Sequence, residues 1–133
     1  MATLRQKRAR IYKDFDLSFS KNSITGDINK KLDVNAVKQS LKNLLLVKKY
    51  ERKFNPTIES PIYKFLFENS LFIKPMVERT IKELIQTYEP RVVIQNINVK
   101  EDVDNLYWKI DLFYYVKGVD KPDSLSLKLD RIR

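Results

Sequence analysis

The feature that most constrains the fold is a change of hydrophobic period at residues 88–91, Tyr-Glu-Pro-Arg. Before this point apolar residues recur at helical spacing, in Val77, Ile81, Leu84, Ile85 and Tyr88. From Val92 onward, apolar and polar residues alternate as they do in strands. Pro90 cannot extend a helix and disfavours helical geometry in the residue before it. The chain is therefore predicted to pass from a helix into a strand here, with Tyr88 anchoring the corner as the last apolar residue of the helix.

Three segments before the corner have features of helices. Apolar residues at helical spacing predict a helix that begins at Val34, with Asp33 able to cap it. The apolar face of this helix comprises Val34, Val37, Leu41, Leu44 and Leu45. Ser60 and Pro61 are typical of the N-cap and first turn of a short second helix, and Pro75 is typical of the first turn of a third.

Alternating segments lie on both sides of the helices. Residues 11–19 alternate and predict a strand with one wet face. Residues 92–99, 106–116 and 124–132 alternate and are separated by short turns, which predicts an antiparallel meander. The sequence thus predicts an α+β domain: an N-terminal strand, three helices, and a three-stranded antiparallel meander forming one sheet packed on the helices.

The basic residues are concentrated in the first part of this 133-residue chain, whose net charge is +9. Residues 1–53 contain 14 Lys and Arg against five Asp and Glu, whereas residues 54–133 contain 12 of each kind. Residues 1–10 include Arg5, Lys7, Arg8 and Arg10, and we expect them to form a flexible basic arm ahead of a single domain at residues 11–133. Such an arm favours acidic partners such as nucleic acid, an anionic membrane or an acidic protein face. A solvated tail that aids solubility is the alternative.

Two missing residue types exclude several kinds of site. The chain has no Cys and no His, so it lacks thiol nucleophiles, disulfides, and the commonest general base and metal ligand. No apolar run is long enough to span a membrane, and no apolar signal segment begins the chain. We therefore expect a cytosolic protein that binds no metal, cofactor or membrane.

Two other functions remain as alternatives to a structural role. A cell-wall glycosidase would need two carboxylates facing a cleft. Glu68, Glu78, Glu83 and Glu89 are available, but Glu78 and Glu83 are five residues apart and share no helical face well. We therefore expect no enzyme. A nucleic-acid-binding module could use the basic arm, but the sequence has no further fingerprint of one. Trp108 could stack bases, although the alternation around it predicts core packing.

A series of short motifs extends on both sides of the corner. The motifs are Phe54-Asn55-Pro56, Leu66-Phe67-Glu68-Asn69, Val77-Glu78-Arg79 and Tyr88-Glu89-Pro90-Arg91. In order and spacing the series resembles the small baseplate wedge protein of contractile-tailed phages, a lysozyme-like wedge family related to the type VI secretion baseplate wedge component. Residues 14–46 resemble the N-terminal half of the longer phage form. The chain departs from the family at Glu59-Ser60, where Gly and a small residue are usual, so the family's turn is not expected to carry over.

The resemblance implies a virion structural protein of the tail baseplate, assembled in the host cytoplasm. It implies that Glu89, Pro90 and Arg91 contact neighbouring wedge proteins of the core bundle. The other implied partners are the tail sheath protein and the tube or hub proteins, with no small-molecule substrate. The implied fold resembles the conserved domain of the sheath protein, so the sheet would template the first tail-sheath ring by strand addition.

Three segments are candidates for these contacts, each with a plainer alternative. The candidate sheath-docking strand comprises Ser124, Leu125, Ser126, Leu127, Lys128 and Leu129, and the alternative is an ordinary edge strand. A further candidate partner surface comprises Leu66, Phe67, Glu68 and Asn69, and the alternative is that Leu66 is core and Asn69 ends the helix. The basic arm would dock on an acidic face of a wedge or tube protein.

The side chains of Glu89 and Arg91 are expected to project to the same side, because they lie two apart in an extended segment. They could pair with each other or point at one partner. If Arg91 faces a partner, Arg91→Ala is expected to leave the fold nearly intact and to weaken wedge assembly.

Overall fold

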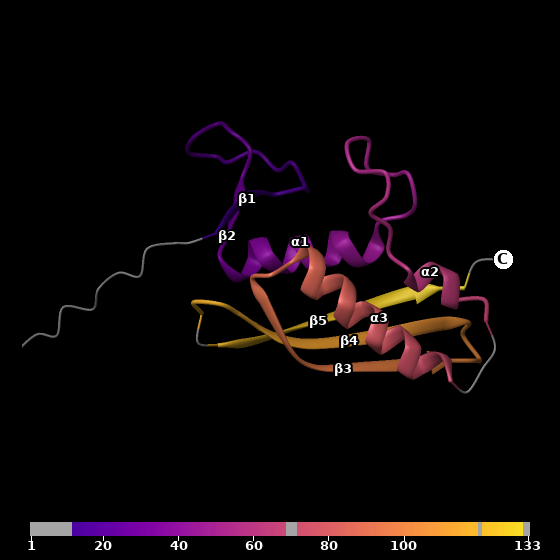
Figure 1. The fold of residues 1–133 in the computed structure, drawn as a ribbon. Coiled ribbons are helices and arrows are strands. Elements are labelled where there is room, and N and C mark those ends of the chain that lie inside the picture. The colour runs from indigo at the N-terminus through magenta and orange to yellow at the C-terminus, as the bar shows by residue number, and fades with distance from the viewer. Residues whose placement is uncertain (1–11, 69–71, 120, 132–133) are drawn as a thin grey trace, which may run out of the picture.

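The main sheet of the computed structural model has three antiparallel strands in the order β3-β4-β5 (Figure 1). The strands are β3 (Val92–Asp102), β4 (Tyr107–Val116) and β5 (Pro122–Asp130). The structure describes residues 12–68, 72–119 and 121–131. The predicted meander is confirmed, with Val92 opposite Val116 in the first pair and Tyr107 opposite Asp130 in the second. Gly118, at φ 86°, lies in the turn between β4 and β5, where its lack of a Cβ permits this backbone conformation.

Two helices cover one face of this sheet, as Figure 1 shows. They are α1 (Val34–Leu46) and α3 (Ile73–Tyr88); the single turn α2 (Ile62–Phe65) precedes α3. Pro75 lies in the first turn of α3, where a missing N–H leaves no intrahelical bond unmade. Asp33 is in the N-cap position of α1 without making a side-chain cap bond. Pro61 occupies the corresponding position of α2, so Ser60 lies one residue earlier than predicted. None of the helices described is long and apolar enough to cross a membrane.

The core lies between the sheet and the two helices. Every second residue of β4 points inward and is at most 1% exposed: Trp108, Ile110, Leu112, Tyr114 and Val116. The helices contribute the apolar faces that the sequence predicts, including Val37, Leu41, Leu45, Val77, Ile81 and Ile85. Tyr88 is an exception, because it is 46% exposed. The chain turns into β3 directly after Tyr88, and Glu89, only 3% exposed, takes the interior position at the corner instead.

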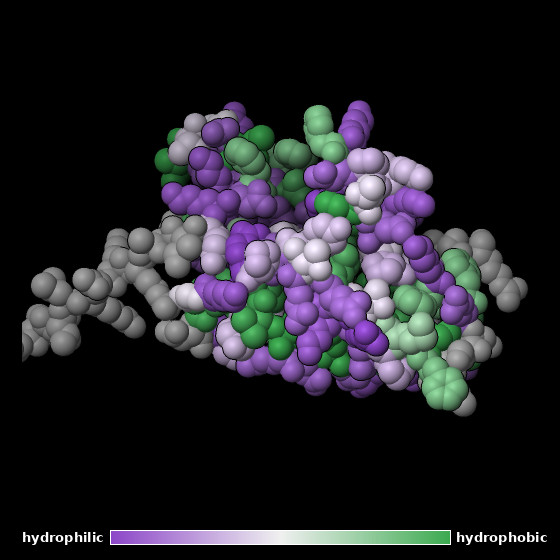
Figure 2. All heavy atoms as spheres, viewed as in Figure 1, coloured by the Kyte–Doolittle hydropathy of each residue, from purple (hydrophilic) through white to green (hydrophobic). Residues whose placement is uncertain are grey.

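The N-terminal strand differs from its prediction in length and in partner. Strand β1 covers only Lys13–Phe15 and pairs with β2 (Lys30–Leu32), so residues 13–32 form a separate N-terminal hairpin beside α1 (Figure 1). Asp16 ends the strand, because its carboxylate accepts the N–H of Ser18 at 3.0 Å and its carbonyl accepts the N–H of Phe19 at 2.9 Å. The apolar side chains expected on a buried face are exposed at Phe15, Leu17 and Phe19. Figure 2 shows green hydrophobic atoms at the surface of this region. Ile11 lies outside the described residues.

Because the N-terminal hairpin is separate from the core, an Ile→Ala substitution should affect the free energy of unfolding differently in the two places. Ile81→Ala empties space in a fully buried site and should lower the free energy of unfolding by ~2–5 kcal/mol. Ile24→Ala removes the same atoms from a side chain that is 92% exposed and should change it by less than ~0.5 kcal/mol. Urea unfolding of both variants measures the difference. Equal losses would show that the loop between β1 and β2 is packed rather than exposed.

Candidate partner interface

The corner between α3 and β3 is built around a buried carboxylate. The Glu89 side chain is 5% exposed. Arg91 donates two hydrogen bonds to its carboxylate, from Nε to Oε1 at 2.5 Å and from Nη2 to Oε2 at 2.7 Å. Ser40 of α1 donates its hydroxyl to Oε2 at 2.7 Å. Of the two arrangements left open by the sequence, Glu89 and Arg91 therefore pair with each other. The same carboxylate ties α1 to the corner.

The backbone explains why these residues meet. The N–H of Glu89 donates to the carbonyl of Ile85 at 2.8 Å and closes the last turn of α3. The carbonyl of Arg91 accepts the N–H of Lys117 at 2.8 Å, which starts the pairing of β3 with β4. Pro90, between them, has no N–H to leave unpaired and is exposed. The proline therefore fixes the change of direction while its two neighbours turn inward together.

The electrostatics of the pair favour the charged forms. Burial would raise the pKa of Glu89, but the hydrogen bonds from Arg91 and Ser40 and the positive charge of Arg91 outweigh it, so the pKa lies below its ordinary value. The bond to Glu89 raises the pKa of Arg91. A glycosidase acid needs a raised pKa, so Glu89 is unsuited to that role.

The N-terminal segment covers another side of Arg91. The Arg91 guanidinium carbon lies 5.1 Å from the centre of the Tyr12 ring, within range of a cation–π contact. The Tyr12 hydroxyl donates to the carbonyl of Lys117 at 3.3 Å. The Arg91 side chain remains 34% exposed. Of the predicted wedge contact, Glu89 is thus interior, whereas Pro90 and part of Arg91 are on the surface.

The second candidate surface is partly internal. Leu66 is 2% exposed and belongs to the core, which confirms the alternative given for it. Arg131 holds this segment from the end of β5, donating to the carbonyls of Leu66 and Glu68 and, at 3.0 Å, to the Glu101 carboxylate. Phe67 is 60% exposed and Glu68 is also at the surface. Asn69 lies outside the described residues, as does the predicted basic arm at residues 1–10.

The two edges of the main sheet differ. On β3 the pairing register shifts between Ile94 and Asn96, so Gln95 forms a bulge, and α3 packs beside this strand. On β5 the pairing with β4 continues without a shift from Pro122 to Asp130. Leu125, Leu127 and Leu129 point into the core, while Ser124, Ser126 and Lys128 are exposed, as their alternation predicts. Among the described residues no strand pairs with the outer side of β5, so it presents a regular, open edge.

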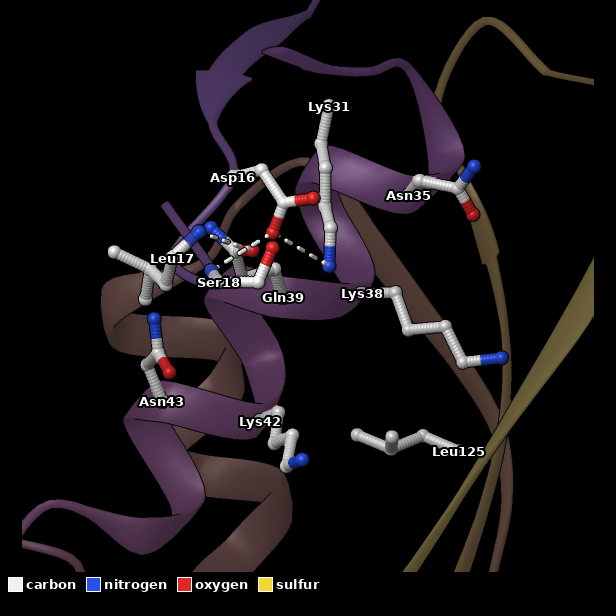
Figure 3. A pocket seen from close by; sticks show the side chains of 10 residues that line it. All are labelled: Asp16, Leu17, Ser18, Lys31, Asn35, Lys38, Gln39, Lys42, Asn43 and Leu125. Atoms are coloured by element: carbon white, nitrogen blue, oxygen red, sulfur yellow. Dashed lines mark hydrogen bonds and ion pairs between the residues drawn. The ribbon is translucent and has the colours of Figure 1, made fainter. Parts of the chain in front are cut away.

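A groove of about 450 Å³ lies between α1, the N-terminal hairpin and this edge of the sheet (Figure 3). It is lined by Asp16, Leu17, Ser18, Lys31, Asn35, Lys38, Gln39, Lys42, Asn43 and Leu125. Three of these residues are lysines and one is an aspartate. Lys31 lies 3.6 Å from Asp16, and Lys38 lies 3.4 Å from Asp123. The groove is therefore basic, and it opens beside β5.

Among the described residues, the side chains named for the alternative functions are not assembled into a site. Trp108 is 1% exposed, so its ring is unavailable for stacking on bases. Glu83 pairs with Arg79 at 2.9 Å on the exposed side of α3. Glu68 and Glu89 lie in the two separate regions described above. Within the described parts of the chain, no group of three or more Asp and Glu residues is placed to hold a metal ion.

Sequence reasoning missed Ser40, Arg131 and the groove lysines. Ser40 is a polar residue that directly precedes Leu41 on the apolar side of α1, and that interruption was a signal for a buried polar partner. Arg131 and the lysines carried no local signal, because their partners lie far away in sequence: Arg131 contacts Leu66, and Lys38 contacts Asp123.

The buried pair changes the expected result of Arg91→Ala. The variant leaves Glu89 charged, buried and without its main partner, so the free energy of unfolding at neutral pH should fall by ~3 kcal/mol. This figure is the low end of the range for breaking a buried pair, because a third of Arg91 is exposed. Arg79→Ala is the matched control: it breaks an exposed pair with Glu83 and should cost less than ~0.5 kcal/mol. Denaturant unfolding compares the two variants, and equal losses of stability would contradict a stabilising role for the buried Glu89–Arg91 pair.

The pair also predicts a pH dependence. Because the folded-state pKa of Glu89 is lowered, its stabilisation is present above the unfolded value of about 4.5 and is lost as the pH falls through the folded value. Wild type should therefore lose its stability advantage over Arg91→Ala as the pH falls from neutral toward the lowered pKa of Glu89, because the unpaired carboxylate of the variant is protonated before that of wild type. Thermal melts of both proteins from neutral to acid pH test this. An advantage that stayed constant in acid would show that Glu89 is not the group that titrates.

This chain is similar in sequence or in fold to several known proteins. A protein of Enterobacteria phage T4, baseplate wedge protein gp25, is 27% identical over 118 residues, which cover 88% of this chain and 87% of that protein. A crystal structure from Geobacter sulfurreducens, of a protein provisionally called a tail lysozyme, has a TM-score of 0.66 at 18% identity and covers 73% of this chain and 89% of that one. A chain in a cryo-EM structure of the anti-feeding prophage baseplate has a TM-score of 0.62 at 19% identity, covering 88% and 83%.

At these identities the two structures show a likeness of fold alone. The family model of baseplate wedge protein gp25 matches residues 32–118, from the last residue of β2 to just beyond β4. This match extends over well more than half of the chain and includes the Glu89–Arg91 corner. The chain therefore belongs to the baseplate wedge protein gp25 family.

Proposed function

We propose that this chain is a structural wedge protein in the baseplate of a contractile phage tail, where it joins inner wedge components and templates the first ring of tail sheath. The observation that carries the proposal is the family match over residues 32–118. In this proposal the protein is assembled in the host cytoplasm and remains in the virion. Its partners are other wedge proteins, the sheath protein and the tube or hub proteins.

The wedge contact is proposed at the exposed part of the corner. Glu89 is already satisfied by Arg91 and Ser40, so its role is to hold the guanidinium in one orientation. Nε and Nη2 of Arg91 face Glu89, and Nη1 makes no hydrogen bond among the described residues, so it is proposed as the donor for a neighbouring wedge protein. Pro90 beside it offers a rigid apolar surface. Phe67, an exposed residue that follows α2, is proposed as a second apolar contact.

The sheath contact is proposed at the outer edge of β5. This edge is regular and open, whereas the bulge at Gln95 disrupts the edge of β3. An extended sheath arm could therefore add to β5 through main-chain hydrogen bonds. Residues 119–133 lie beyond the family match, so the support for this contact comes from geometry.

No catalytic step is proposed, although one structural relative is called a tail lysozyme. The buried carboxylate, Glu89, has a lowered pKa and lies in a salt bridge rather than in a sugar cleft. Nucleic-acid binding through the basic arm is the alternative that the experiments below can detect.

Photo-crosslinking tests the edge directly. A photoreactive amino acid at Ser124, exposed on β5, should crosslink to the sheath protein in assembled tails, because paired residues on adjacent strands lie about 5 Å apart. The same group at Gln95, exposed on the bulged edge, is the matched control and should give no sheath product. Sheath products from Gln95 alone would move the contact to β3, and their absence from both positions would refute sheath templating.

A further inference from the structure

We infer that the groove beside β5 selects an acidic partner: the segment that adds to this edge carries an Asp or Glu whose side chain stands next to that of Leu125. This inference rests on the proposed function, because it assumes strand addition at β5. The acidic residue would let the groove recognise the added strand and fix its register on β5.

The groove lies where the side chains of an added strand would project. Leu125 is the β5 residue that lines it, and its side chain is on the helix-facing side of the sheet. Neighbouring strands are spaced about 4.8 Å apart, and paired residues share a face. The residue paired with Leu125 would therefore project into the groove, whose lining side chains and Leu125 are labelled in Figure 3.

The cations on that side come from one face of α1. Asn35, Lys38 and Lys42 are spaced three and four residues apart, so they form one stripe along the helix. Figure 3 shows the side chains of Lys38 and Lys42 extending toward the sheet side of the groove, where Leu125 lies. A carboxylate beside Leu125 would meet this stripe.

Lys42 is the groove cation without an acidic partner in the described part of the chain. Lys31 is held by Asp16, and Lys38 by Asp123, whose other oxygen accepts the Tyr114 hydroxyl at 3.2 Å. No ion pair or hydrogen bond of Lys42 occurs among the described residues. A carboxylate from outside would therefore find a free ammonium group and a second lysine nearby.

The walls of the groove are fixed before a partner arrives. Gln39 is 9% exposed, and its amide donates to the carbonyl of Phe15 at 2.8 Å and accepts the N–H of Leu17 at 3.4 Å. These bonds hold the N-terminal hairpin on α1. A preformed site costs less ordering when it binds.

Charge and shape disfavour the other occupants. The chain's own residues 1–10 carry four bases and no acid, so a basic groove repels them. A second copy would present Leu125, Leu127 and Leu129 on this face of its β5, and its Asp123 is already bonded to Lys38 and Tyr114. Nucleic acid shares the negative charge, but no aromatic residue lines the groove to stack a base.

The test uses the full chain with the photoreactive group at Ser124 and the sheath protein of the same particle, after nuclease treatment. Lys42→Glu should lower the affinity for sheath, measured by crosslink yield against sheath concentration, at least about tenfold. Lys82→Glu on α3 makes the same change of charge on an exposed residue beside the other edge and should have less than about a twofold effect. Mass spectrometry of the crosslinked peptide should find an Asp or Glu next to the crosslinked residue.

The outcomes separate the two proposals. If Ser124 crosslinks to sheath but Lys42→Glu binds as well as wild type, or the peptide lacks an acid, the acidic partner is refuted and strand addition stands. If wild type gives no sheath product, both fail. A product between two copies of this chain would assign the groove to self-association. Loss of binding to a short DNA duplex in Lys42→Glu, with sheath binding unchanged, would assign it to nucleic acid.

Discussion

The structure depends on one buried carboxylate at the point where the helical layer becomes the sheet. Glu89 follows α3, Arg91 begins β3, and Ser40 reaches the same carboxylate from α1. A charge placed this deep is tolerated only with its bonds made, so the three segments are fixed relative to one another. The contact thus joins α1, the end of α3 and the start of β3 at one point.

This internal role changes how the Glu-Pro-Arg corner can serve an assembly. A partner that needed Glu89 would have to displace Arg91 from a buried pair. A partner that uses Nη1 of Arg91 and the Pro90 ring instead meets a guanidinium already held in place by Glu89 and Tyr12. Under the proposed function, folding and recognition share residues at this corner, so stability and assembly have to be measured separately in every variant.

The sequence predicted the parts of the fold that follow from local period and from proline. The meander, the helix from Val34 and the inward leucines of β5 are confirmed because their patterns are long and regular. The predicted N-terminal strand was too long, because the turn at Asp16 ends the strand after Phe15. Tyr88 was misplaced because periodicity does not show where the sheet stops covering a helix. The bulge at Gln95 and the contacts of Ser40, Arg131 and Lys38 depend on long-range packing, which no local pattern encodes.

A cryo-EM map of the sheathed tail that resolves this chain in its baseplate would show directly whether the sheath protein pairs with β5. The proposed sheath contact predicts an extended segment of the sheath protein paired along the outer edge of β5, with Glu89 still bound to Arg91 at the corner between α3 and β3. An outer edge of β5 left open to solvent, or a sheath segment paired along β3 instead, would contradict it.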